Sequence, residues 1–268
     1  MLVHFINGNS HDMTARNLCY FNGVEIDDIP IECLIQKIQS KAFPPFSFIV
    51  TPNIDHFYRL DVHENAGFIN AYKNATLRVC DSRITQKLSI LEKSPIKNVV
   101  PGSDLTRMLL ASEWARINRI LLVGASHEEA ETIREKYKLS NFQHYSPPMG
   151  FIKCEHEILK CIELIKSANA DITFLAVGSP QQEILADRVH KSLTGNINSG
   201  SVMLCIGASF DFLSGKIIRA PLFVQKLHME WLFRALSDPK RLVPRYWKNF
   251  TWILTYISKK ALSKTNKH

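Results

Sequence analysis

The sequence lacks any long hydrophobic run. No stretch of its 268 residues approaches the roughly 18 consecutive apolar residues that a membrane-spanning helix needs. The first residues, MLVHFINGNSHDM, also lack the charged and then apolar pattern of a signal peptide. We therefore expect the chain to act in the cytoplasm. With 46% hydrophobic and 22% charged residues, it has the composition of a globular protein with a sizeable core.

Generic cofactor and metal motifs are also missing. The six cysteines include no Cys-x-x-Cys pair, so we expect reduced, mostly buried thiols rather than a disulfide framework or a structural zinc site. The glycine fingerprint of dinucleotide sites does not occur, nor does the terminal Gly-Lys-Ser/Thr of P-loops. A nicotinamide-dependent oxidoreductase is therefore the weakest of the functions considered.

Positive charge is concentrated in the last fifth of the sequence. The net charge is +8, but residues 216–268 carry twelve Lys and Arg against two acidic residues, a net +10, so the preceding residues carry −2. This asymmetry predicts that the C-terminal region meets something anionic, which would be a phosphate-bearing substrate, an anionic membrane or a nucleic acid.

Four short apolar runs each end in a turn signal and lead into a helical pattern, as a strand followed by a crossover helix does. They are PFSFIV before Thr51, RILLVGAS through Gly124, DITFLAVGSP through Gly178 and SVMLCIGASFDF through Gly207. Repeated units of this kind predict an α/β fold with a mostly parallel sheet and helices on both faces. Ligands collect beyond the carboxyl ends of such strands, so the four turns mark the expected active-site edge.

Two amphipathic stretches are expected to be helical, one at residues 54–72 and one in the tail. After Gly215 the sequence predicts a helix that ends at Asp238-Pro239, a short basic link to Pro244 and a last helix. We divide the chain into a core, 1–214, and a basic C-terminal appendage, 215–268. On the last helix an apolar row is expected beside Trp247 and Leu254, formed by Tyr246, Phe250, Ile253, Ile257 and Ala261.

The last helix allows two interpretations. A cationic helix with tryptophan and tyrosine on its apolar side fits the membrane interface. Taken alone, however, an amphipathic helix more often packs its apolar face on a protein core.

A series of longer motifs runs through about four fifths of the chain. They are TPNIDHFYRL (51–60), CD (80–81), VPGSDL (100–105), LLVGAS (121–126), MGF (149–151), AVGSPQQE (176–183), IGASFDFLSGKIIRAP (206–221) and MEWLFRALSDPKRLVPRY (229–246). In content and order they resemble the WecG/TagA/CpsF family of bacterial glycosyltransferases, glycosyltransferase family 26. PGSDL, GSPxQE and GxxFDFxxGxxxRAP in one chain make the resemblance very specific.

The resemblance implies a Rossmann-like core of the GT-E type. It implies transfer, with inversion, from a UDP-sugar to a sugar on undecaprenyl diphosphate during assembly of a surface polysaccharide. N-acetylmannosamine, its uronic acid, glucuronic acid and glucose are the implied donor sugars, and a few pocket side chains would decide among them. It further implies a peripheral protein at the cytoplasmic face of the inner membrane, in contact with anionic lipids and able to self-associate.

Inversion in one displacement needs a base that takes the proton of the acceptor hydroxyl. Asp81 occupies the position of the family's proposed catalytic aspartate, and Thr51 and Asn53 align with polar residues that line its pocket. Taken alone, an aspartate at a strand end more often caps a turn. The family usually has glycine after this aspartate, whereas this chain has Ser82 followed by Arg83, a departure that concerns the local backbone and the acceptor fit.

The sequence has no Asp-x-Asp, the motif with which many nucleotide-sugar enzymes hold a metal ion, so we expect neither a metal nor another cofactor. Helix N-termini and guanidinium groups would then stabilise the departing diphosphate. Any single surface arginine is usually only a solvated charge, but four match positions that are thought to close over the family's active site. The implied substrate-binding residues are Gly124, Gly178, Ser179, Pro180, Gln181, Gln182, Glu183, Gly207, Asp211, Arg219, Arg234, Arg241 and Arg245.

Several residues stay open to more than one interpretation. At Gln181 the family more often has a basic residue, so contacts with the donor would differ. His56 would orient Asn53 or serve as a structural histidine. We expect Asp104 in a turn or cap and Asp211 in a role that shapes the pocket.

One alternative function belongs to another class of protein. Charge alone also allows a non-enzymatic protein whose tail binds anionic lipid or nucleic acid by counterion release. The aromatic, apolar last helix favours lipid, and we expect no nucleic acid partner.

Overall fold

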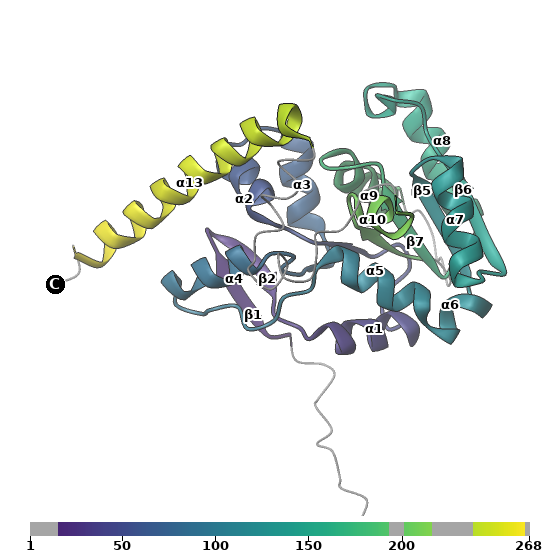
Figure 1. Cartoon of the computed structure of the whole chain (residues 1–268), viewed down its shortest axis with the longest axis horizontal. Coiled ribbons are helices and arrows are strands. Elements are labelled where there is room, and N and C mark those ends of the chain that lie inside the picture. The colour runs from purple at the N-terminus through teal and green to yellow at the C-terminus, as the bar shows by residue number, and fades with distance from the viewer. Residues whose placement is uncertain (1–15, 193–200, 216–237, 266–268) are drawn as a thin grey trace, which may run out of the picture.

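A parallel sheet of six strands forms the centre of the protein (Figure 1). The computed structural model describes residues 16–192, 201–215 and 238–265. Within them the strand order is β4-β3-β8-β7-β5-β6, and every neighbouring pair is parallel. The predicted α/β class is confirmed. The strands are β3 (Phe48–Val50), β4 (Leu77–Arg78), β5 (Arg119–Gly124), β6 (Asn141–Tyr145), β7 (Ile172–Ala176) and β8 (Val202–Cys205).

The four apolar runs of the sequence form the four central strands of the sheet. β3, β8, β7 and β5 each have a neighbour on both sides, and they are buried on both faces by helices. The two edge strands, β4 and β6, were not predicted. β4 has only two residues, and β6 reads NFQHY with side chains that are partly exposed, because an edge strand has one neighbour and less to bury.

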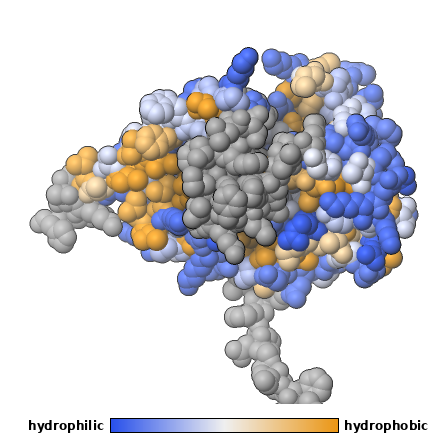
Figure 2. Space-filling model, viewed as in Figure 1, coloured by the Kyte–Doolittle hydropathy of each residue, from blue (hydrophilic) through white to orange (hydrophobic). Residues whose placement is uncertain are grey.

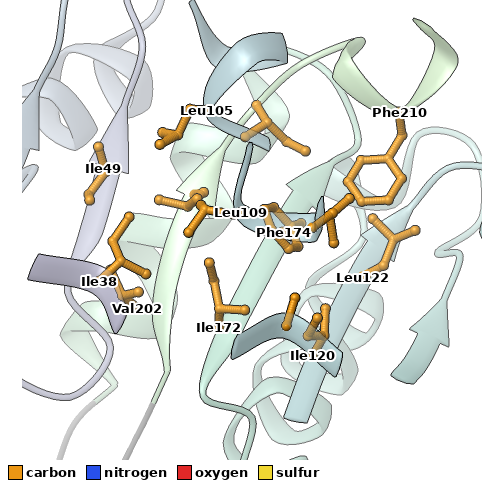
Figure 3. Packing of buried hydrophobic residues seen from close by; sticks show 14 of the residues in the cluster. Ile38, Ile49, Leu105, Leu109, Ile120, Leu122, Ile172, Phe174, Val202 and Phe210 are labelled. Atoms are coloured by element: carbon orange, nitrogen blue, oxygen red, sulfur yellow. The ribbon is translucent and has the colours of Figure 1, made fainter. Parts of the chain in front are cut away.

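Helices cover both faces of the sheet and create two hydrophobic cores. Alternate strand residues point to opposite faces, so Ile49 belongs to one core while Phe48 and Val50 belong to the other. Figure 3 shows the first core, where Phe174 of β7 packs against Phe210 of a short helix with ring centroids 5.6 Å apart. Its helices are α1 (Ile31–Gln39), α5 (Gly102–Ala111), α6 (Glu113–Ile117), α7 (His127–Tyr137) and α10 (Ser209–Leu213), and those of the second are α3 (Ala66–Asn74), α8 (Glu155–Ser167) and α9 (Gln181–Lys191).

A third cluster joins segments from opposite ends of the described chain. The antiparallel hairpin of β1 (Leu18–Phe21) and β2 (Val24–Asp27) packs with α2 (Ile54–Asp61) and with the last described helix, α13 (Pro239–Thr265). At its centre the Phe21 ring lies 4.7 Å from that of Phe57 and 5.1 Å from that of Tyr256. Trp252 and Tyr256 of α13 are therefore core residues.

Two carboxylates anchor α13 to this cluster. Trp252 Nε1 donates to Asp61 Oδ2 at 2.8 Å, and the Tyr256 hydroxyl donates to Glu92 Oε1 at 2.7 Å. Lys260 adds an ion pair with Glu92 at 2.6 Å. Partial burial raises the pKa of Asp61 and of Glu92, but the hydrogen bonds outweigh it, and both pKa values lie below the ordinary range. Glu92 follows α4 (Arg83–Leu88) and the short 3₁₀ helix η1 (Ser89–Leu91). A second 3₁₀ helix, η2 (Phe151–Lys153), precedes α8.

Two expectations about helices need correction. Residues 54–72 do not form one helix, because the chain turns at Val62–Asn65, where His63 has φ +51° and the Asn65 side chain caps α3 by accepting from the Phe68 N–H at 3.0 Å. The expected link to Pro244 is helical instead. α13 begins at Pro239, where a fixed proline φ suits a first helical turn, and continues through Pro244. The helix expected to end at Asp238 lies outside the described residues.

α13 buries one face and exposes a second apolar face (Figure 2, left). Leu242, Trp252 and Tyr256 are buried. The predicted single row was wrong, because Ile253 packs inward while Phe250 and Ile257 are exposed. The exposed stripe, whose side chains are between 39% and 66% exposed, consists of Val243, Trp247, Phe250, Leu254 and Ile257. Among the described helices, none combines the length and the apolar character required to cross a bilayer.

Candidate active site

The turns that follow the strands meet at one edge of the sheet. Because the strands are parallel, their carboxyl ends all lie on the same side. Thr51 follows β3, Asp81 follows β4, Gly178 follows β7 and Gly207 follows β8. β3 and β8 are neighbours although distant in sequence, and open α/β sheets bind ligands where the strand order changes direction in this way. The predicted convergence of the turns at Thr51, Gly124, Gly178 and Gly207 on one edge is confirmed, and the turn at Asp81 lies on the same edge.

Asp81 is held between the turn after β3 and the start of α5. Its backbone N–H donates to the Pro52 carbonyl at 3.0 Å, and its Oδ1 accepts from the Gly102 N–H at 2.7 Å. Gly102 is the first residue of α5, so the half-buried carboxylate lies at a helix N-terminus, where the helix dipole favours an anion. Asp81 thus makes the capping contact expected of an aspartate at a strand end, and this contact fixes the orientation of its carboxylate.

Thr51 lies against the same helix start. Its hydroxyl donates to the carbonyl of Cys205, at the end of β8, over 3.1 Å. A Cβ atom on Gly102 would make a tight contact with Thr51 Oγ1, at 3.3 Å, and an ordinary contact with Ser209 Oγ, at 3.5 Å, so little space separates Gly102 from Thr51. Thr51 and Asp81 are therefore brought together around Gly102.

Asn53 is the N-cap of α2. Its side-chain oxygen accepts from the Asp55 N–H at 3.1 Å. His56 Nδ1 lies 3.2 Å from the Asn53 backbone nitrogen and 2.9 Å from its side-chain oxygen, which completes a capping box. On the other side of the ring, His56 Nε2 lies 3.6 Å from Glu183 Oε1. His56 thus orients Asn53 and links it to α9.

Gln182 and Glu183 use their side chains within the protein. Gln182 Oε1 accepts from the Gly207 N–H at 2.9 Å, and Gln182 Nε2 donates to Glu183 Oε1 at 2.9 Å. Complete burial raises the pKa of Glu183, but the His56 ring and the Gln182 amide outweigh it, so this pKa lies below its ordinary value. The pair ties the turn after β7 to the turn after β8.

The turn before α9 presents partly exposed groups at the same edge. Gly178 has φ +80°, and the Ser179–Pro180 peptide bond is cis. Ser179 Oγ accepts from Arg59 Nη1 of α2 at 3.4 Å. Gln181, also partly exposed, begins the 11-residue helix α9, whose N-terminus suits an anionic ligand.

Gly124 and Asp211 are placed differently from the other predicted residues. Gly124 has φ +103°, and a Cβ atom there would lie 2.6 Å from the carbonyl carbon and oxygen of Ala176. Close packing of β5 on β7 therefore accounts for glycine at this position. Asp211 lies in the first turn of α10, partly exposed, where α10 packs against α5 and α7.

One of the four predicted tail arginines is seen in full. Arg245 forms an ion pair with Asp55 of α2, with Nε and Oδ1 3.1 Å apart. Arg219 and Arg234 lie outside the described residues, and so does the side chain of Arg241, whose backbone belongs to α13.

Sequence reasoning missed Asp55, Arg59 and Gly102. Asp55 and Arg59 stand four residues apart just after the Asn53 cap, which is a signal for an ion pair on one helix face. Nothing in the local sequence indicates that Arg245, from another helix, also contacts Asp55.

Within the described part of the chain, no group of three or more His, Cys, Asp or Glu side chains is arranged to hold a metal ion.

Comparison with known proteins identifies the class, and the chain is a glycosyltransferase. Residues 19–267 match the model of the Glycosyl transferase WecG/TagA/CpsF family. The chain belongs to this family, which confirms the resemblance of its motifs and removes the non-enzymatic alternative. It is similar to two proteins of Staphylococcus aureus, strains MRSA252 and MW2, each named N-acetylglucosaminyldiphosphoundecaprenol N-acetyl-beta-D-mannosaminyltransferase. Each is 30% identical over 228 residues, which cover 82% of this chain and 85% of the relative.

Proposed function

We propose that the chain transfers a sugar from a UDP-sugar to a glycan linked to undecaprenyl diphosphate, with inversion and without a metal ion. Family membership and the printed activity of the Staphylococcus aureus relatives support this proposal. Because those relatives are named for transfer of N-acetylmannosamine to N-acetylglucosaminyl diphosphoundecaprenol, we propose that sugar and that acceptor first. The uronic acid, glucuronic acid and glucose remain the other donor sugars to test.

Asp81 is proposed as the base that takes the proton of the acceptor hydroxyl. The observation that carries this role is the contact between Asp81 and the start of α5, which holds the carboxylate at the edge where Thr51 and Asn53 also lie. Thr51 and Asn53 would position the acceptor or the sugar. A carboxylate held in one orientation can act on a hydroxyl within hydrogen-bond reach.

The leaving diphosphate is proposed to bind between the turn before α9 and the arginines of the appendage. Guanidinium groups match phosphate oxygens in a bidentate geometry, and a helix N-terminus favours an anion. Arg59 contacts this turn at Ser179, and Arg245 shares the carboxylate of Asp55 with Arg59. The sequence offers no Asp-x-Asp to perform this task with a metal.

A transfer assay tests the proposal. Purified full-length protein is incubated with each UDP-sugar of the panel and a short-chain lipid-diphosphate N-acetylglucosamine acceptor, and UDP release and glycolipid product are measured. We expect product with one donor, UDP release that requires the acceptor, and an unchanged rate in EDTA. Loss of activity in EDTA that Mg²⁺ or Mn²⁺ restores would contradict metal independence, and no product with any donor would contradict the proposed substrates.

We also propose that the appendage, residues 215–268, binds the anionic cytoplasmic surface of the inner membrane through α13. α13 carries the exposed Lys248 and Lys259 as well as the exposed stripe, so the helix combines apolar surface with positive charge that attracts anionic headgroups. An apolar row that is left open while the other face is packed fits an interface better than a core.

Leu254→Glu and Thr255→Glu form a matched pair that tests this docking. Both add one negative charge at an exposed position of α13, but only Leu254 belongs to the stripe. The shared charge costs about 1 kcal/mol of binding, and loss of leucine burial costs roughly 1.5–3 kcal/mol more. We expect Leu254→Glu to weaken sedimentation with phosphatidylglycerol vesicles at least about tenfold more than Thr255→Glu. Equal effects of the two variants would contradict insertion of the stripe.

A further inference from the structure

A single buried carboxylate holds two arginines near the turn before α9. The Asp55 side chain is 8% exposed. Its Oδ2 faces Arg59 of the same helix, whose Nε lies 3.0 Å away, and its Oδ1 faces Arg245 of α13, whose Nε lies 3.1 Å away. Each carboxylate oxygen thus serves one guanidinium group, and the three side chains together carry one excess positive charge.

The two arginines differ in what else they contact. Arg59 is only 14% exposed, lies 5.4 Å from the centre of the Phe68 ring and donates to Ser179 Oγ. It is fixed between α2 and the turn before α9. Arg245 is 43% exposed and meets Asp55 through Nε. Among the described residues this contact with Asp55 involves Nε, and a guanidinium group held in this way can present its two terminal nitrogens to an anion in the bidentate geometry that phosphate oxygens favour.

Asp55 itself is kept ionised. Burial raises its pKa, but the charges of Arg245 and Arg59 and the hydrogen bond from Arg59 outweigh burial, and the pKa lies below its ordinary value. At neutral pH the side chain is therefore a permanent anchor for both guanidinium groups.

We infer that Asp55 is a positioning residue for the leaving diphosphate. Its carboxylate sets Arg245 of α13 and, through Arg59, the Ser179 turn in the places from which they bind the diphosphate. This inference rests on the proposed function, because it assumes a nucleoside diphosphate bound at this turn. It assigns to α2, in the first third of the chain, the task of aligning an arginine from the appendage.

α13 has anchors other than Asp55. About two to four helical turns after Arg245, Trp252 donates to Asp61, and Tyr256 and Lys260 donate to Glu92. Neutralising Asp55 should therefore misplace the guanidinium group of Arg245 while the helix stays docked. Trp252 fluorescence reports whether the helix does stay docked.

The chain offers a close control for an Asp55→Asn variant. Asp171 also has a side chain that is 8% exposed, and it too holds two cations, Lys41 at 2.7 Å and Arg119 at 3.3 Å. It precedes β7 and so lies at the opposite edge of the sheet from the turns. Asp171→Asn removes the same kind of contacts away from the proposed site.

Steady-state kinetics of the full-length variants with the active UDP-sugar, and inhibition by UDP, test the inference. We expect Asp55→Asn to raise the KM for the donor and the inhibition constant of UDP about tenfold, with a smaller change in kcat, whereas Asp171→Asn changes each less than about twofold. Asp55→Glu, which keeps the charge, should recover part of the loss. In an Arg245→Gln background, Asp55→Asn should add less than it does alone, because the part of its effect that passes through Arg245 is already lost and only the part through Arg59 remains.

Three results would overturn the inference. They are equal kinetics for Asp55→Asn and Asp171→Asn, additive effects of Asp55→Asn and Arg245→Gln, and tighter UDP binding in Asp55→Asn, which would make Asp55 a competitor of the diphosphate. Failure of the proposed function gives a different pattern, because the unsubstituted protein would then fail to form product from any UDP-sugar.

Discussion

Asp81→Asn is expected to lower kcat for sugar transfer by roughly 10²–10⁴, the range attributed to a general base. Asparagine has nearly the shape of aspartate, and its side-chain oxygen can still accept from the Gly102 N–H that now bonds Asp81 Oδ1. The start of α5 should therefore stay capped, and the protein should stay folded. What the variant loses is the group that accepts the proton of the acceptor hydroxyl.

The control is Asp104→Asn, in the first turn of the same helix. Asp104 lies 3.9 Å from Arg107, a loose ion pair between partly exposed side chains. Removing its charge should leave kcat within about twofold, since such pairs contribute little. Initial rates at saturating donor and acceptor give the comparison, and circular dichroism checks the fold. Near-normal turnover by Asp81→Asn would mean that another group, or water, takes the proton.

Gly124→Ala should have the largest effect on stability. The new Cβ would lie 2.6 Å from the carbonyl carbon and oxygen of Ala176 and 2.8 Å from the Val177 nitrogen. These are backbone atoms of the neighbouring strand and its turn, so no side chain can move aside to make room. Overpacking and the unfavourable φ of +103° together are expected to cost about 2–5 kcal/mol of unfolding free energy.

Gly150→Ala separates the two causes. Gly150 also has a positive φ, +79°, but a Cβ there meets nothing within 4 Å. This variant should therefore lose only the backbone term, about 1–2 kcal/mol. Urea unfolding of both variants measures the difference. Equal losses would show that close packing of β5 on β7 is not what requires glycine at position 124.

The central part of the fold could be predicted because burial dictates its sequence. β3, β5, β7 and β8 are covered on both faces, so each must be a continuous apolar run, and such runs are easily recognised. The edge strands β4 and β6 are short or partly polar and give no such signal. The β1–β2 hairpin, in contrast, did carry a recognisable sequence signal. Its turn is Asn22-Gly23, with φ +48° and +76°, and Asn-Gly between apolar residues is the strongest short-range hairpin pattern.

The part of the site that follows from the order of strands and turns could be predicted. Turns that follow parallel strands must meet at one edge, and this places Thr51, Gly124, Gly178 and Gly207 on the same side. Asp81 follows the unpredicted edge strand β4, so only the family resemblance pointed to it. Contacts between distant segments leave no local trace. Nothing near Arg245 indicates Asp55 as its partner, and the spacing of apolar residues in α13 could not tell which of two apolar sides would be buried.

α13 packs over the β1–β2 hairpin, and this packing affects folding while the chain is being synthesised. Phe21 and Phe57 are synthesised about 200 residues before Trp252 and Tyr256, whose rings pack around Phe21. Until then the growing chain carries an open aromatic surface, the kind of surface on which nascent proteins aggregate or recruit chaperones. A protein cut before α13 would keep that surface open permanently. Poor solubility of such a fragment would then report an uncovered hairpin rather than the loss of a catalytic part.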